Sequence, residues 1–246
     1  MRTQGSLWLL IASLLCLTPI AFSQTPVQLS DNGSYSAVSC DGPQGCVGAG
    51  LYGGTINGVN VGSGDKVAGM ICDDYFDTIT PGEKWNANGF SVANLTSGNI
   101  GSLTLFGTGM GSAAIQDYTE IAYLVGQMFN PSLSHSQQAA LSEAIWYITS
   151  GTASDPGLLN SHDAGYDSTA QAYLTAAGAS GVNLSQFAGL YVYTPTSGPP
   201  RPQEMWSMVA VPEGGTALAY LLLAGLACFG AMVVRSRRQL CARGSA

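Results

Sequence analysis

Basic residues are scarce in this sequence. Residues 24 to 211 include only three of them, Lys66, Lys84 and Arg201, against 14 acidic residues, which gives this part a net charge of −11 with histidine neutral. A protein needs lysine and arginine side chains to neutralise phosphates, and an acidic surface repels polyanions. The composition therefore argues against nucleic acid as a partner.

Catalytic signatures are also lacking. The chain has two histidines, His135 and His162, and contains no G-x-S-x-G elbow, no metalloprotease helix and no phosphate-binding loop. We therefore predict that the protein is not an enzyme and uses no cofactor. An envelope hydrolase stays open as an alternative, because residues distant in sequence can meet in a fold.

Only three cysteines, Cys40, Cys46 and Cys72, lie between residues 24 and 211. Exported proteins put cysteines into disulfides, and the turn-forming segment DGPQG separates the first two. We predict a Cys40–Cys46 disulfide. Cys72 is left over, either as a small buried apolar residue or as a reactive thiol.

Long hydrophobic runs occur only near the two ends. Near the beginning, Arg2 is followed by an apolar run over residues 7–20 and by small residues up to Ser23. This order is typical of a secretory signal peptide. We predict a signal peptide over residues 1–23, with cleavage after Ser23.

The second run, residues 216–234, contains no charged residue. As a helix it would be roughly 28 Å long, close to the thickness of the hydrocarbon core of a bilayer. The run is followed by the basic residues Arg235, Arg237 and Arg238, and such residues favour the cytoplasmic side. We predict a transmembrane helix over 216–234, a cytoplasmic tail over 239–246 and an external N-terminal domain.

The residues around this run resemble a known sorting signal. Val211-Pro212-Glu213-Gly214-Gly215, one apolar span and the arginine cluster are together similar to the PEP-CTERM signal of bacterial exosortase substrates. The resemblance implies that an exosortase-type enzyme recognises residues 212–238 and cleaves near Pro-Glu, so that the protein reaches the envelope or the outside. Gly214 replaces the usual second proline, and an ordinary single-span anchor is the alternative.

The part between these ends shows strand patterns followed by helix patterns. Short apolar or alternating runs between 51 and 105, including SLTLFG at 102–107, predict strands. Apolar spacing and capping residues predict three helices, which cover residues 115–129, 134–150 with a Ser134–Gln137 capping box, and 168–178. LYVYTP and EMWSMV predict two more strands.

We therefore expect an α+β fold, with a mainly antiparallel, barrel-like sheet and a helical insert. Residues 24–200 would form the exported domain, and residues 201–211 a linker and the last strand.

Two short motifs in this domain resemble those of thioester domains. Cys72-Asp73 matches the cysteine motif, and Ala144-Ile145-Trp146 matches the end of the glutamine motif. The resemblance implies a domain in which the cysteine attacks a glutamine amide to form an internal thioester. The expected glutamine position holds Ser142, so that bond cannot form there, and Gln138 is the nearest substitute, one helical turn earlier.

Other side chains allow both a functional and a structural interpretation. Asp73, Asp74 and Asp77 are oxygen ligands of the kind that Ca²⁺ takes, but their spacing fits no EF-hand loop, and we predict no metal site. Five aromatic residues could form a carbohydrate-binding face or could belong to the core. They are Trp85, Trp146, Tyr191, Tyr193 and Trp206.

The leading hypothesis is thus an exported bacterial envelope or extracellular-matrix protein. Its role would be non-catalytic, either structural or the binding of a surface polysaccharide or protein. A covalent adhesin that uses a thioester between Cys72 and Gln138 is the alternative.

Overall fold

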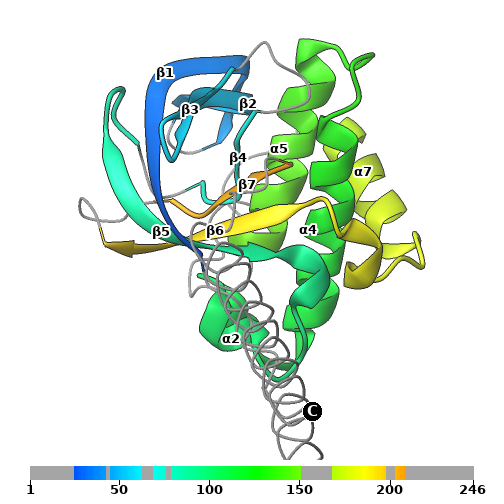
Figure 1. The fold of residues 1–246 in the computed structure, drawn as a ribbon. Helices are drawn as coiled ribbons and strands as arrows, with labels where there is room; N and C mark the ends of the chain where they lie inside the picture. Colours follow the sequence, from blue (N-terminus) through cyan, green and yellow to red (C-terminus); the bar gives the residue numbers. More distant parts are fainter. Residues whose placement is uncertain are drawn as a thin grey trace, which may run out of the picture.

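The structure, a computed structural model, describes residues 25–42, 45–62, 69–75, 79–150, 168–197 and 203–208. All strands of these segments pair antiparallel in one sheet, and the helices are inserted in the chain between β5 and β6 (Figure 1). The predicted α+β fold with an antiparallel sheet and a helical insert is therefore confirmed.

The sheet has the strand order β3-β2-β1-β5-β6-β7-β4. Its strands are β1 (Thr25–Gly42), β2 (Gly45–Ile56), β3 (Val59–Val61), β4 (Ile71–Cys72), β5 (Lys84–Ser91), β6 (Tyr191–Ser197) and β7 (Met205–Ser207). Met70, directly before β4, also pairs with Tyr52 of β2 through two backbone hydrogen bonds. The sheet therefore curves until the β4 end meets β2.

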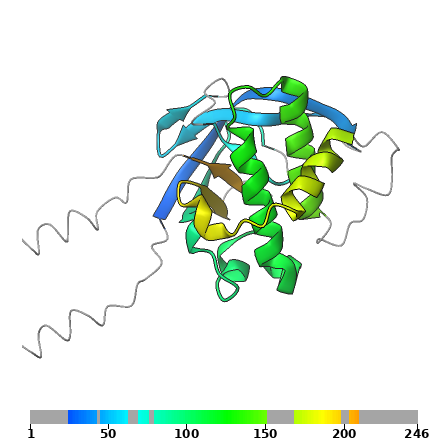
Figure 2. The same ribbon diagram turned by 90° about the vertical axis from the view of Figure 1, so that its right-hand side faces the viewer.

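The helices and 3-10 turns follow β5. They are η1 (Val92–Asn94), α2 (Ile100–Leu103), α3 (Gly107–Met110), η2 (Gly111–Ala113), α4 (Ala114–Met128), α5 (His135–Ser150), α7 (Ser168–Gly178) and η3 (Leu184–Phe187). The three longest, α4, α5 and α7, lie together on one side of the sheet (Figures 1 and 2). The structure thus confirms the three predicted helices.

On β4, β6 and β7, neighbouring residues belong to different hydrophobic clusters, because successive side chains of a strand point to opposite faces. Ile71 and Trp206 pack with the helices, whereas Cys72 and Met205 pack in a second cluster on the other face. That second cluster takes side chains from all seven strands. The curved sheet therefore has its own apolar interior, separate from the layer that the helices cover.

The beginning of α5 is fixed by its capping box. Ser134 N donates to Gln137 Oε1 (2.9 Å), and Gln137 N donates to Ser134 Oγ (3.3 Å). These reciprocal bonds satisfy backbone donors that have no partner inside a helix. The predicted role of Gln137 as the cap partner is confirmed.

The strand prediction for SLTLFG was wrong. Residues 100–103 and 107–110 form α2 and α3, with a non-helical connection between them. Thr104 Oγ1 donates to Ile100 O (2.6 Å), and Ile100 is buried in the helix-side core. These local bonds stabilise helical turns where the alternation of apolar residues suggested a strand.

The Cys40–Cys46 disulfide is present, and it joins β1 to β2 near the exposed tip of their hairpin. The predicted signal peptide and transmembrane helix lie outside the described residues. Among the residues that the structure does describe, no helix combines the length and the apolar character that crossing a bilayer requires.

Replacing the capping serine tests the role of the capping box. We expect Ser134→Ala to lower the free energy of unfolding by about 1 kcal/mol, because backbone donors at the start of α5 lose their acceptor. Urea unfolding followed by circular dichroism measures this change. Ser132→Ala, in the exposed segment just before the cap, is the matched control and should leave stability unchanged.

Candidate functional site

Cys72 is buried at the end of the short strand β4. It pairs with Met205 of β7, and only 1% of its surface is exposed. Its thiol donates to Asp74 O (3.0 Å) and accepts from Asp74 N (3.3 Å). The thiol is therefore engaged by the backbone two residues further on, in a place that solvent does not reach.

Helix α5 holds the backbone around Cys72. Trp146 Nε1 donates to Cys72 O (3.1 Å), and Thr149 Oγ1 donates to Asp73 O (2.5 Å). The two motifs singled out in the sequence, Cys72-Asp73 and Ala144-Ile145-Trp146, are thus in contact in the fold. The amide that would react in a thioester domain is, however, absent from its expected position on α5.

Ser142, which stands at that position, has a structural partner. An irregularity in the β1–β2 pairing lies between Tyr35 and Ala37, where Gly50 adopts a positive φ of 77°. Gly50 N donates to Ser142 Oγ (2.8 Å), and Leu51 N donates to a serine of β1 (2.8 Å). A bulge leaves ladder donors without strand partners. The Ser142 hydroxyl therefore satisfies one of these backbone donors, the amide of Gly50.

Gln138 lies one turn before Ser142 and packs against the same bulge. Only 1% of its surface is exposed, and its Cβ is 3.3 Å from where a side chain at Gly50 would begin. Its Oε1 atom is buried and has no hydrogen-bond partner. A buried amide oxygen without a partner costs free energy, so this atom is an unusual feature of the helix–sheet contact.

The most concentrated polar cluster joins Asp73 to Glu204, just before β7. Both carboxyl groups are fully buried. Glu204 accepts hydrogen bonds from Leu105 N (2.7 Å), Tyr118 Oη (2.6 Å) and Thr194 Oγ1 (2.5 Å). Asp73 Oδ2 accepts from the indole of Trp206, which lies two residues after Glu204 in the sequence (2.6 Å).

The surroundings of the two acids affect their pKa values differently. Burial raises the pKa of Asp73 well above 3.8, and the negative charge of Glu204 raises it further. Burial also raises the pKa of Glu204, but its donors, including Thr194 and Tyr118, act in the opposite direction. Burial therefore favours the neutral form of Asp73 more strongly than that of Glu204, whose charged form is stabilised by its donors.

Neither buried cluster is open to a substrate. A carboxyl pair with one proton is an arrangement used in acid–base catalysis, but catalysis requires a path for the reacting molecule. Asp73 and Glu204 have no exposed surface, and Cys72 has almost none. Their arrangement therefore supports a structural role: the pair connects β4 and β7 with β6 and α4.

The structure bears on two sets of side chains that allowed both a functional and a structural interpretation. Asp77 lies outside the described residues, and Oδ2 of Asp73, which was considered with it and Asp74 as an oxygen ligand, accepts a hydrogen bond from Trp206. Among the described residues no cluster of three or more metal-binding side chains exists.

The five aromatic residues that could have formed a carbohydrate-binding face do not form an exposed surface. The indoles of Trp85, Trp146 and Trp206 are buried, as is Tyr193, while Tyr191 is half-buried. These residues belong to the hydrophobic clusters, where a carbohydrate chain has no access to them.

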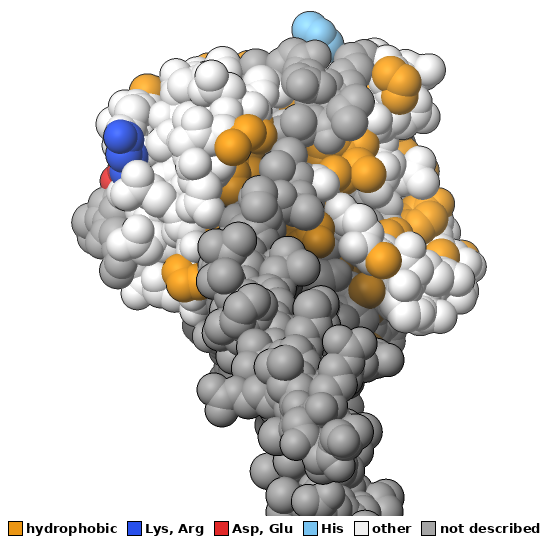
Figure 3. All heavy atoms as spheres, in the orientation of Figure 1, with side chains coloured by type: hydrophobic (Ala, Val, Ile, Leu, Met, Phe, Trp, Pro, Cys, Tyr) orange, Lys and Arg blue, Asp and Glu red, His pale blue; other side chains and the backbone are white. Residues whose placement is uncertain are grey.

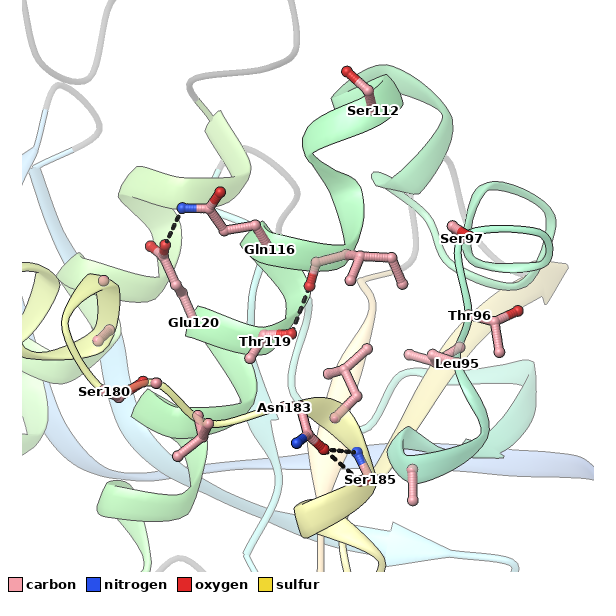
Figure 4. Close-up of a pocket in the computed structure, with 17 residues that line it drawn as sticks. Leu95, Thr96, Ser97, Ser112, Gln116, Thr119, Glu120, Ser180, Asn183 and Ser185 are labelled. Carbon is pink, nitrogen blue, oxygen red and sulfur yellow. Dashed lines mark hydrogen bonds between the residues drawn. The ribbon is translucent and has the colours of Figure 1, made fainter.

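An accessible candidate site lies elsewhere, along α4. A groove of about 730 Å³ is formed by the N-terminal half of α4, the loop after η1, and the segment from the end of α7 to η3 (Figure 4). Leu95, Ile115 and Leu184 contribute apolar surface to it. No sequence motif pointed to this groove, because its walls come from segments that are separated in the chain.

Hydroxyl and amide groups surround the apolar part of the groove. On α4, Gln116 Nε2 donates to Glu120 Oε1 (2.9 Å), and the other walls carry further hydroxyls, such as those of Ser97 and Ser180 (Figure 4). Asn183 accepts from Ser185 N (3.1 Å) and so begins η3 with a capping box. The groove can therefore exchange hydrogen bonds with a ligand over an apolar base.

Comparisons with protein-family models, with curated proteins and with solved structures find no match for this chain.

The raised pKa of Asp73 predicts that stability falls as pH rises. Because the folded pKa of Asp73 lies above its ordinary value of 3.8, its stabilising effect is complete below that pH and is lost as pH rises through the folded pKa. Between the two pKa values, we expect the free energy of unfolding to fall by about 1.4 kcal/mol per pH unit from this group. Urea unfolding at a series of pH values measures the slope.

Asp73→Asn should flatten this slope and raise stability at alkaline pH, since an amide keeps the pair at a single charge. Asp117→Asn on α4 removes the same formal charge and is the matched control. The pKa of Asp117 is also raised, by burial and by Glu120, but this carboxyl group is partly exposed. Asp117→Asn should therefore change the slope less than Asp73→Asn does. An equal slope in Asp73→Asn and the unmodified protein would contradict a raised pKa of Asp73.

Proposed function

We propose that the protein is an exported bacterial envelope or extracellular-matrix protein with a non-catalytic binding or structural role. The observation that carries this proposal is the Cys40–Cys46 disulfide on an exposed hairpin. Disulfides persist in oxidising compartments outside the cytosol. The apolar runs at the two ends of the sequence support the same location.

Export would use the signal peptide over residues 1–23 and a membrane helix over 216–234. The PEP-CTERM-like segment, which includes Val211, Pro212 and Glu213, follows the last described strand after a few residues. An exosortase-type enzyme would act on this segment once the domain is outside. The protein would then stay in the membrane or pass to the matrix, according to whether cleavage occurs.

A non-catalytic role is supported by how the reactive side chains are used. Cys72 and the carboxyl pair are buried, and the hydroxyl of Ser142 accepts from a backbone amide. The groove along α4 carries the accessible polar groups described above. Its lining combines hydroxyls and amides with one carboxylate and has no histidine or cysteine, so it suits the binding of a ligand better than a reaction.

The export proposal is tested by the mass of the native product. We expect the protein isolated from the envelope or medium of its bacterial host to begin at Gln24 and, after processing, to end near Val211. Intact-mass spectrometry of the fractions measures both ends. A variant with Pro212→Ala and Glu213→Ala should retain its C-terminal residues if cleavage depends on that motif.

Full-length protein in the cytosol, with both ends intact, would overturn the proposal. An exported protein that begins at Gln24 and ends at Ala246 would favour the single-span anchor over exosortase processing.

A covalent adhesin is a second candidate, and one observation favours it. Gln138 is buried on α5 and its Oε1 has no hydrogen-bond partner, so its amide group is not fully used by the fold. A thioester between Cys72 and Gln138 would form when the thiolate attacks the amide carbon and ammonia leaves. A primary amine would later open it and take the acyl group.

Treatment with methylamine separates the two candidates. The non-covalent role predicts no mass change at Gln138 and alkylation of Cys72 only after unfolding. A methylamide at Gln138, together with release of the Cys72 thiol, would support the adhesin. Cys72→Ala is the control for that result, since a true thioester cannot form in this variant, whereas non-specific modification would persist.

A further inference from the structure

We infer that the groove along α4 binds a neutral glycan chain through its hydroxyl groups. This inference rests on the proposed function, because it names the ligand class for the binding role of an exported protein. The walls of the groove are the N-terminal half of α4, the loop after η1 and the segment that leads into η3 (Figure 4).

The lining has the hydrogen-bonding chemistry of sugar recognition. Thr96 and Ser97 lie on one wall, Gln116 and Glu120 on another, and Ser180 at the third. Hydroxyls both donate and accept, a carboxylate accepts from adjacent hydroxyls, and a carboxamide does both. A chain that presents hydroxyl groups along its whole length can match such a set, whereas an apolar ligand would leave these polar groups without partners.

Charge excludes anionic ligands from this groove. Its only charged lining residue is Glu120, and Lys84, on β5, is the only lysine or arginine among the described residues. Figure 3 shows how sparse charge is on one face of the molecule, where a single blue group stands on a largely white surface. Uronate, sulfate and phosphate groups would therefore meet a carboxylate and no compensating cation.

The walls are held in place before any ligand binds. Thr96 N donates to Asn99 Oδ1 (2.7 Å), which fixes the loop after η1. Thr119 Oγ1 donates to Ile115 O (2.6 Å) within α4, and Leu95 and Leu184 are anchored in the helix-side core. Preorganised walls reduce the entropy that binding would otherwise cost.

The size and apolar surface of the groove set the expected strength of binding. Its volume of about 730 Å³ falls within the range of small-molecule sites. Its apolar lining is aliphatic, with residues such as Ile115 and Val182, and includes no aromatic ring against which a sugar could stack. Binding of one chain should therefore be weak, with a dissociation constant of about 1 mM.

Titration with three matched oligosaccharides tests the inference. The full-length chain in a sugar-free detergent is titrated with N-acetylchitohexaose (neutral), its deacetylated hexamer (cationic) and oligogalacturonate (anionic), with cellohexaose and maltohexaose as further neutral probes. Amide chemical shifts report binding. We expect at least one neutral probe to shift residues 93–97, 112–120 and 177–185, and the anionic probe to leave them unchanged.

Two tryptophan variants test whether neutral oligosaccharides bind in the groove. Ser112 lines the groove and is exposed, so Ser112→Trp should fill it without disturbing the core, and should weaken neutral binding by at least about tenfold. Ser132→Trp, on an exposed segment that does not line the groove, is the matched control and should bind as the unmodified protein does.

Glu120→Gln separates a glycan site from a cation site. Neutral binding should weaken but persist in this variant, because glutamine keeps one of the two acceptor oxygens of the carboxylate. Shifts caused only by the cationic hexamer, and lost in Glu120→Gln, would overturn the inference, as would the absence of groove shifts with all neutral probes. Neither result concerns export, which the native masses test separately.

Discussion

The burial of two carboxyl groups, Asp73 and Glu204, at one place is the constraint on which the rest of the structure depends. The two acids lie fully buried where four elements meet, and every donor around Glu204 comes from a different part of the chain. Two negative charges in this place would repel each other without water to screen them, so the arrangement requires one neutral acid.

This pair also explains how the helical insert is joined to the sheet. Tyr118 of α4 and the backbone of Leu105 donate to Glu204, while the chain around Asp73 is held by Thr149 of α5. The helices therefore contact the sheet through apolar packing and through buried hydrogen bonds at several points, of which this pair is one and the Gly50–Ser142 bond another. Apolar packing alone tolerates small shifts of a helix, whereas a buried hydrogen-bond network specifies one position.

Much of the fold could be predicted from local patterns. The helices α4, α5 and α7 have regular apolar spacing or capping residues, such as Ser134 with Gln137, and these signals lie within a few residues of the elements that they define. The long strand β1 (Thr25–Gly42) was not predicted, because polar residues and the Asn32-Gly33 step interrupt its alternation. Its inward residues Val27 and Leu29 are recognisable only once their neighbours are known.

The sites were harder to predict than the elements. The burial of Cys72, one of the two alternatives that the sequence left open, is observed in the structure. The partner of Asp73 was missed, because Glu204 lies far away in sequence and no motif connects them. The role of Ser142 depends on an irregular strand pairing at Gly50, and strand irregularities have no simple sequence signature.

The place of β7 in the sheet has a mechanical consequence. β7 is hydrogen-bonded to β6 on one side and to β4 on the other, and it is the last described strand before the C-terminal segment. Tension transmitted through that segment would enter the domain at an inner strand whose neighbouring residue, Glu204, is held by buried hydrogen bonds. The fold would therefore resist a force applied on the C-terminal side of β7 better than a domain pulled through a strand at the edge of its sheet.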